Sequence, residues 1–171
     1  MTPGTEVHEM KKILSIFALI LALALPSLSW GAIGSCVETS FTVYPGTNRA
    51  VLIYTCTGGT AGETGTYPAT AFATATWTEL RNRGFFLYKV ITNPGAVPPE
   101  DNWDFTLVDG DGIDVLGGAG ANRHTTNSQM IAPLIAADVR FAQPVLDAWT
   151  LTVTGNTTAS AVIVFKFDFE R

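Results

Sequence analysis

The run of residues 109–125, DGDGIDVLGGAGANRHT, combines acids, glycines and one of the two histidines of the chain. Carboxylate oxygens are the ligands that Ca²⁺ prefers, and the run offers three candidate metal ligands: Asp109, Asp111 and Asp114. An EF-hand loop beginning at the first acid would need an oxygen ligand, a Gly and a Glu at positions five, six and twelve. Those positions hold Ile113, Asp114 and Gly120. The spacing excludes an EF-hand and leaves a looser acid-lined calcium site as a secondary interpretation.

Other site chemistries lack their required partners. The two Asp-Gly pairs have neither the third glycine and following helix of a dinucleotide-binding loop nor the Lys of a phosphate-binding loop. His124 has no recognisable nucleophile to activate, and a zinc site built from it and the two cysteines fits no known ligand spacing. A glycosidase would need a pair of carboxylates, and Glu100, Asp101 and Asp104 could supply one. In a chain with 15 acids, however, such a group arises by chance. We therefore expect no enzymatic activity and no cofactor.

Backbone conformation explains more of the same run. Asp-Gly pairs favour tight turns because Gly accepts positive φ and Asp accepts hydrogen bonds from nearby amides. Residues 117–121 carry almost no side-chain bulk and can pass close to other backbone. Side-chain hydrogen bonds from the next two residues would pin the far end. The predicted structural turn residues are Gly110, Gly112, Gly117, Gly118, Gly120, Asn122 and Arg123.

The two cysteines suggest a disulfide. Strand-like segments flank a Pro-Gly-Thr turn at residues 45–47, and a hairpin with Tyr44 opposite Asn48 brings Cys36 opposite Cys56. A bridge there would close a loop of about 20 residues and stabilise the fold by about 3 kcal/mol in the chain-entropy model. Two alternatives stay open. The sequence IGSC ending at Cys36 has the form of a lipobox, in which that cysteine is lipidated, or both thiols are free.

The chain begins with a hydrophobic leader. Lys11 and Lys12 precede the apolar run Ile13–Leu25, and Pro26 and small residues follow, which is typical of a secretory signal peptide. We assign residues 1–9 to a mis-assigned start, residues 10–31 to the signal peptide and residues 32–171 to one β-sandwich domain. An uncleaved membrane anchor is the alternative.

Composition narrows the partners and the location. The formal net charge is −5 and the basic residues are scattered, so nucleic acid is not an expected partner. We expect contact with a membrane only through the leader or through a lipid attached to Cys36. The leader predicts an extracytoplasmic protein, in the periplasm, secreted or at a cell surface.

Short apolar segments separated by turn residues predict an all-β single domain, an antiparallel β-sandwich or jelly-roll-like fold. The clearest alternation lies in residues 148–155 and 160–170. Residues 84–92 are apolar on both faces and are expected to form a central strand. Residues 127–140 fit either a strand or a short helix, and the sequon-like residues 156–158 are interpreted as a turn. The other predicted strands are 37–44, 50–55, 71–80, 102–108 and 113–116.

The central and C-terminal sequences together resemble a known group of proteins. KVITNPGAVPPEDNWDFTLVDGDGIDVLGGAGANRHTTNS (Lys89–Ser128) and TLTVTGNTTASAVIVFKF (Thr150–Phe167) are similar to small proteins of tailed bacteriophages and prophages, encoded among virion structural genes and mostly of undefined role. The resemblance implies a β-sandwich-like virion component with no catalytic residues. The leader and the cysteine pair depart from that group.

The expected function is a non-enzymatic structural or binding module that acts through protein–protein contacts or self-association, with a virion as the alternative location. A function of another class is a secreted carbohydrate- or calcium-binding adhesin-like domain. In that interpretation, loop aromatics such as Tyr67 or Trp77 would stack on sugar rings.

Overall fold

The computed structural model describes residues 32–60, 65–136 and 139–171. The predicted start artefact at residues 1–9 and the signal peptide at residues 10–31 lie outside the described residues. Within the described ranges the chain is an all-β domain with one short helix. No helix in the described part is long and apolar enough to cross a membrane.

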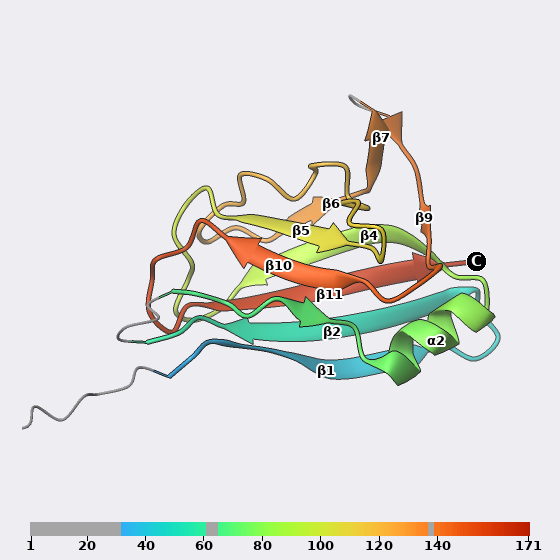
Figure 1. The fold of residues 1–171 in the computed structure, drawn as a ribbon, viewed down its shortest axis with the longest axis horizontal. Coiled ribbons are helices and arrows are strands. Elements are labelled where there is room, and N and C mark those ends of the chain that lie inside the picture. The colour runs from blue at the N-terminus through green and yellow to red at the C-terminus, as the bar shows by residue number, and fades with distance from the viewer. Residues whose placement is uncertain (1–31, 61–64, 137–138) are drawn as a thin grey trace, which may run out of the picture. The chain divides into compact units, whose positions relative to one another are not determined.

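The larger sheet is antiparallel and has the C-terminal strand at its centre (Figure 1). Its strand order is β1 (Ser35–Val43), β2 (Arg49–Thr57), β11 (Val162–Glu170), β4 (Phe86–Pro94) and β6 (Gln129–Ile131), and β9 (Gln143–Pro144) also pairs with β4. β11 pairs along its whole length with β2 on one side and β4 on the other. The strand predicted from the alternation at residues 160–170 is therefore confirmed.

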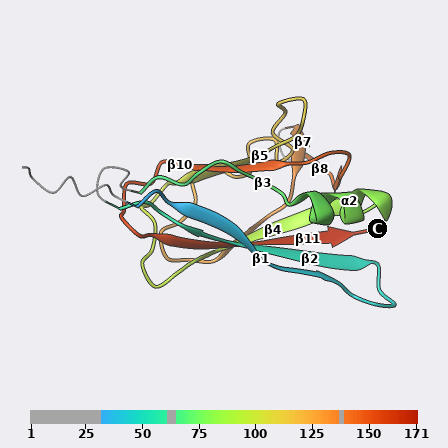
Figure 2. The same ribbon diagram turned by 60° about the horizontal axis from the view of Figure 1, so that its bottom comes forward.

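A smaller sheet covers one face of the larger one (Figure 2). It consists of β3 (Thr70–Ala71), β10 (Thr150–Thr154) and β5 (Asp104–Val108), in the order β3-β10-β5. A separate two-stranded sheet pairs β7 (Leu134–Ala136) with β8 (Val139–Arg140). The predicted antiparallel β-sandwich is confirmed.

The core lies between the two layers and is rich in aromatic rings. The ring of Phe165 on β11 lies 5.0 Å from that of Phe105 on β5 and 5.9 Å from that of Trp103, both in edge-on geometry. Such pairs stabilise a fold beyond the area that they bury. Every second residue of β11 is fully buried against this cluster: Ile163, Phe165, Phe167 and Phe169. The alternate residues of β11 face the outer side of the large sheet.

The strand predicted at residues 71–80 is wrong, because α2 (Thr74–Asn82) occupies most of it. Thr76 and Leu80, four residues apart, are the buried positions of the helix. The guanidinium of Arg81 lies 4.6 Å from the ring centre of Trp77, again at helical spacing. Thr76 also donates a hydrogen bond of 2.8 Å to Glu38 of β1, which fastens the helix to the sheet edge.

The first hairpin contains the predicted disulfide, but its strands pair in a different register from the predicted one. Val43 pairs with Ala50, so the turn is one residue longer than a pairing of Tyr44 with Asn48 requires. A bulge between Glu38 and Ser40 removes the offset and brings Cys36 opposite Cys56. The two cysteines are disulfide-bonded. Neither cysteine of the described residues is a free thiol.

The disulfide has a consequence for location. Disulfides form and persist in oxidising compartments and are rare in the reducing cytoplasm. The Cys36–Cys56 bond therefore indicates an oxidising, extracytoplasmic environment.

One further segment differs from the prediction, and an ambiguous one is resolved. Residues 113–116 are not a strand, and a single bridge between Val108 and Asp114 is all that pairs them with β5. The ambiguous residues 127–140 form β6, β7 and β8, short strands rather than a helix. The turn at residues 156–158 buries Asn156, whose amide donates hydrogen bonds to the carbonyls of Gly65 and Thr158.

Candidate functional site

The outer face of the large sheet carries apolar side chains, and within the described residues no second layer covers them. One row across the sheet is set by strand register and runs Ile53, Lys166, Ile91 and Met130. Met130 is 62% exposed, whereas the other three are half-buried by their neighbours. The small sheet covers the opposite face, so this row faces solvent.

Residues 84–92 were predicted to be central because both faces of the segment are apolar. β4 does have partners on both sides, β11 and β6, but its outward side chains are exposed: Phe86 is 39% and Tyr88 48% exposed. The predicted central position is confirmed, since β4 has a partner strand on each side, although its outward side chains are exposed. The outward aromatics are the sequence signal that could have indicated an exposed apolar surface.

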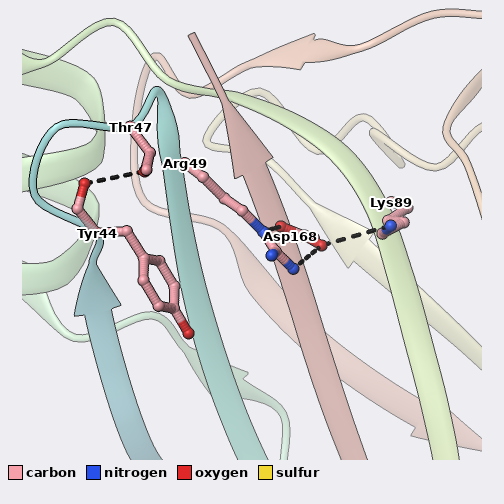
Figure 3. A network of polar contacts seen from close by, with 5 residues as sticks. All are labelled: Tyr44, Thr47, Arg49, Lys89 and Asp168. Carbon is pink, nitrogen blue, oxygen red and sulfur yellow. Dashed lines mark hydrogen bonds and ion pairs between the residues drawn. The ribbon is translucent and has the colours of Figure 1, made fainter.

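A buried carboxylate holds two cations on this face (Figure 3). Asp168 projects outward from β11, yet its side chain is 2% exposed. Arg49 donates two hydrogen bonds of 2.7 Å to its carboxylate, and the Lys89 ammonium lies 3.5 Å from it. Burial alone would raise the pKa of Asp168, but hydrogen bonding and charge from Arg49, followed by Lys89, outweigh burial and hold the pKa below its ordinary value.

Aromatic rings support the same two cations. The Arg49 guanidinium lies 5.7 Å from the ring centre of Tyr44, and the Lys89 ammonium lies 5.5 Å from that of Tyr88. The ring face attracts a cation electrostatically and so favours this placement. The two cations therefore have defined positions on the outer face rather than swinging freely.

A pocket of about 340 Å³ opens where β4, β6 and the segment after β8 meet. We call it the outer pocket; it is lined by Tyr88, Lys89, Met130, Ile131, Ala132, Arg140, Phe141 and Ala142. Three of its apolar residues are strongly exposed: Tyr88, Met130 and Phe141, the last at 56%. The other part of the lining is cationic, from Lys89 and Arg140. Such a pocket suits an apolar group flanked by negative charge.

Two of the three candidate metal ligands, Asp109 and Asp114, accept hydrogen bonds from backbone amides. One Asp109 oxygen accepts hydrogen bonds from the amides of Asp111, at 3.1 Å, and Ile113, at 2.8 Å. Both carboxylate oxygens of Asp114 accept backbone amides, from Leu107, Leu116 and Gly118. Among the described residues, no group of three His, Cys, Asp or Glu side chains is placed to hold a metal ion. The weak calcium candidates Asp109, Asp111 and Asp114 thus lie in a hydrogen-bonded turn.

The glycines of the run lie where backbone segments approach closely. A Cβ on Gly120 would collide with the carbonyl oxygen of Phe105, and one on Gly117 with that of Leu134. Gly112 and Gly118 both have φ of 83°. Gly110 lies against the Asp147 carboxylate, which accepts its amide at 2.9 Å.

The far end of the run is held by backbone as well as side-chain groups. The backbone amide of Asn122, not its side chain, donates to Asp104 at 2.7 Å. The guanidinium of Arg123 donates to the carbonyl of Ala121. Trp103 and Arg123 form an isolated β-bridge. These contacts close the loop against β5.

The remaining candidate side chains also support loops. His124 accepts backbone amides from Thr126, at 3.0 Å, and Asn127, at 3.1 Å, through Nδ1. The three clustered acids each accept a backbone amide: Glu100 from Thr157, Asp101 from Thr125 and Asp104 from Asn122. A pair of carboxylates free to act on a bond is not assembled from these residues.

The aromatic residues proposed to stack on sugars are placed differently from the prediction. Tyr67 is buried, and its hydroxyl donates a hydrogen bond of 3.1 Å to the carbonyl of Ala161. Burial raises the pKa of that hydroxyl well above its usual value. Trp77 lies on α2, packed against the core and under Arg81, rather than on a loop. The expectation that Tyr67 contacts a ligand is therefore wrong.

Comparison with known proteins adds no relative: no protein-family model, curated protein or solved structure matches this chain.

Proposed function

We propose that this chain is a non-enzymatic structural or binding module that acts through protein–protein contacts, and that the outer pocket is its contact site. One observation carries the proposal: Tyr88, Met130 and Phe141 are exposed around a single pocket. Exposed apolar side chains that gather at a hollow, rather than scattering singly, are typical of interaction sites. The flanking cations, Lys89 and Arg140, would select for an acidic partner surface.

The proposal extends to the setting. The module acts outside the cytoplasm, in the periplasm, at a cell surface or after secretion, or it is part of a virion, as the resemblance to phage proteins implies. A gene position between capsid and tail genes, together with detection of the chain in purified particles, would support the virion setting. If the chain is absent from the particles that the host releases, the result would favour an exported protein over a virion component.

A photocrosslinking amino acid at Met130 tests the contact site in the producing cells. We expect covalent adducts at this position, identified by mass spectrometry, and fewer of them when Phe141→Ala accompanies the crosslinker. The matched control places the crosslinker at Val37, which is 52% exposed on the opposite edge strand. Equal adduct yields at the two positions, or none at Met130, would refute the outer pocket as the contact site.

A further inference from the structure

The turn at residues 109–114, here called the acidic loop, presents an apolar tip between acids. Ile113 is 62% exposed at the end of the turn. Asp111 before it is exposed, and Asp109 and Asp114 flank it in sequence. Asp147 adds a fourth carboxylate at the base of the loop through its bond to Gly110.

The acidic loop is held in shape before any contact is made. The amide of Asp109 donates to the carbonyl of Ile113 at 3.0 Å, and that of Gly112 donates to the carbonyl of Asp109 at 3.1 Å. The two side-chain bonds from Asp109 close the same turn. A rigid loop loses little conformational entropy on binding, so its exposed tip is well suited to insertion.

The loop and the outer pocket are complementary in chemistry. The pocket offers apolar contact from Tyr88, Met130 and Phe141 and positive charge from Lys89 and Arg140. The loop offers one aliphatic side chain surrounded by carboxylates. The four carbon atoms of an isoleucine side chain fit easily in about 340 Å³.

The two surfaces share no residue and are built from different strands. Lys89 and Met130 lie on the outer face of the large sheet, whereas the loop follows β5 of the small sheet, in the other layer (Figure 2). One copy could therefore use both at once. A contact between two different surfaces of identical copies propagates from copy to copy instead of closing as a two-fold dimer.

We propose that the acidic loop of one copy inserts Ile113 into the outer pocket of a second copy, so that the chain associates with itself head to tail. The inference rests on the proposed function and names its partner: a second copy of this chain. Buried aliphatic contact supplies the affinity, and the opposite charges set the orientation and make it dependent on salt.

The test uses the purified, disulfide-bonded chain in sedimentation velocity over a range of concentrations. Wild type should associate with increasing concentration at low salt and less so in 0.5 M NaCl. Two variants each remove one side of the contact: a loop variant, Asp111→Lys with Ile113→Lys, and a pocket variant, Met130→Glu with Arg140→Glu. Each alone should weaken association by about 10-fold or more. Val37→Lys, an exposed apolar position outside both surfaces, should associate like wild type.

Mixing the two variants is the decisive arm. The loop variant keeps its pocket and the pocket variant keeps its loop, so the mixture has one productive contact and should give a 1:1 heterodimer that grows no further. A two-fold contact between like surfaces predicts no such recovery. Near-ultraviolet circular dichroism checks that all variants fold. If either does not, Ile113→Ser replaces the loop variant and Met130→Ser replaces the pocket variant.

Several outcomes would overturn the inference. They are a wild type that stays monomeric at low salt, a loop variant that associates like wild type, and a mixture that does not recover. In each case adducts from the crosslinker at Met130 decide separately on the proposed function. Adducts to another protein would keep the outer pocket as a contact site while removing self-association. Adducts to residues 109–114 of a second copy support both.

Discussion

Neutralising Asp168 should destabilise the fold because its carboxylate organises two cations. Asp168→Asn keeps the size of the side chain but removes the charge that Arg49 contacts at 2.7 Å and Lys89 at 3.5 Å. Hydrogen bonds to charged groups contribute about 1.5–3 kcal/mol each. The two partner side chains are 44% and 28% exposed, so solvent screening reduces the total. We expect a loss of about 2 kcal/mol at pH 7, or roughly 6–10 °C in Tm.

The loss should depend on pH in a defined direction. The folded-state pKa of Asp168 lies below its ordinary value, so the stabilisation is complete above the unfolded pKa of about 3.9 and disappears as the pH falls through the folded pKa. The difference in unfolding free energy between wild type and Asp168→Asn should therefore be largest at pH 5–7 and narrow toward pH 2. Asp168 holds the pKa of Arg49 above its ordinary value, so this guanidinium stays charged over this range and does not complicate the comparison.

Urea unfolding followed by tryptophan fluorescence measures the difference, because Trp103 and Trp149 are buried and report on the core. Glu170→Gln is the matched control, since Glu170 lies on the same face of the same strand but is exposed. Its effect should stay within about 0.5 kcal/mol. If Asp168→Asn unfolds like wild type at pH 7, or if the difference does not narrow in acid, the carboxylate does not organise this network.

Three further outcomes are expected. Reduction, or Cys36→Ser, should lower the unfolding free energy by about 3 kcal/mol, since the disulfide closes a 20-residue separation; an unchanged urea midpoint would contradict this. Gly120→Ala should lower the free energy of unfolding several-fold more than Gly118→Ala. The methyl group added at residue 120 would collide with the Phe105 carbonyl, whereas the one at residue 118 would lie in open space and cost about 1 kcal/mol of backbone strain. Similar shifts in Tm for the two variants would disprove the close approach. Burial and the nearby Glu38 raise the pKa of Tyr54 to about 12, so Tyr54→Phe should remove a late step from the alkaline absorbance titration; a titration complete near pH 10.5 would contradict it.

The sequence predicted best the strands whose two faces meet different surroundings. β10 alternates strictly between threonine and apolar residues, and β11 buries every second residue; Leu151 and Phe165 are among the buried inward residues. The disulfide was also predictable, because two strands joined by one turn leave few registers. The assumed turn was one residue too short and the bulge after Glu38 compensated, so the correct pairing came from two offsets that cancel.

The misprediction at α2 has a physical cause. Its threonines and Trp77 favour strands intrinsically, and the helix has no side-chain N-cap. Packing of Thr76 and Leu80 against the core overrides those preferences. The spacing of Glu79 and Arg83, four residues apart and ion-paired, was the available helical signal.

Sequence reasoning missed the outer pocket because its lining comes from three separate segments. Tyr88 and Lys89 lie on β4, Met130 on β6, and Phe141 follows β8, and none of these segments carries a motif. The acidic loop, in contrast, was conspicuous in the sequence but was weighed as a metal site. Its carboxylates are largely taken up by backbone amides, and Ile113, the residue that the calcium pattern rejected, is the exposed one.

Lys89 connects the ion network to the outer pocket. Its ammonium contacts Asp168 on one side, while its side chain lines the pocket on the other. The 3.5 Å separation is longer than the 2.7 Å bonds from Arg49, so Arg49 supplies most of the compensation for the buried carboxylate. In the proposed contact, Lys89 would face an acidic group of the partner as well as Asp168. The buried Asp168 carboxylate, which lies on the outward face rather than in the core, would then serve the proposed contact by fixing the position of the Lys89 ammonium at the edge of the outer pocket.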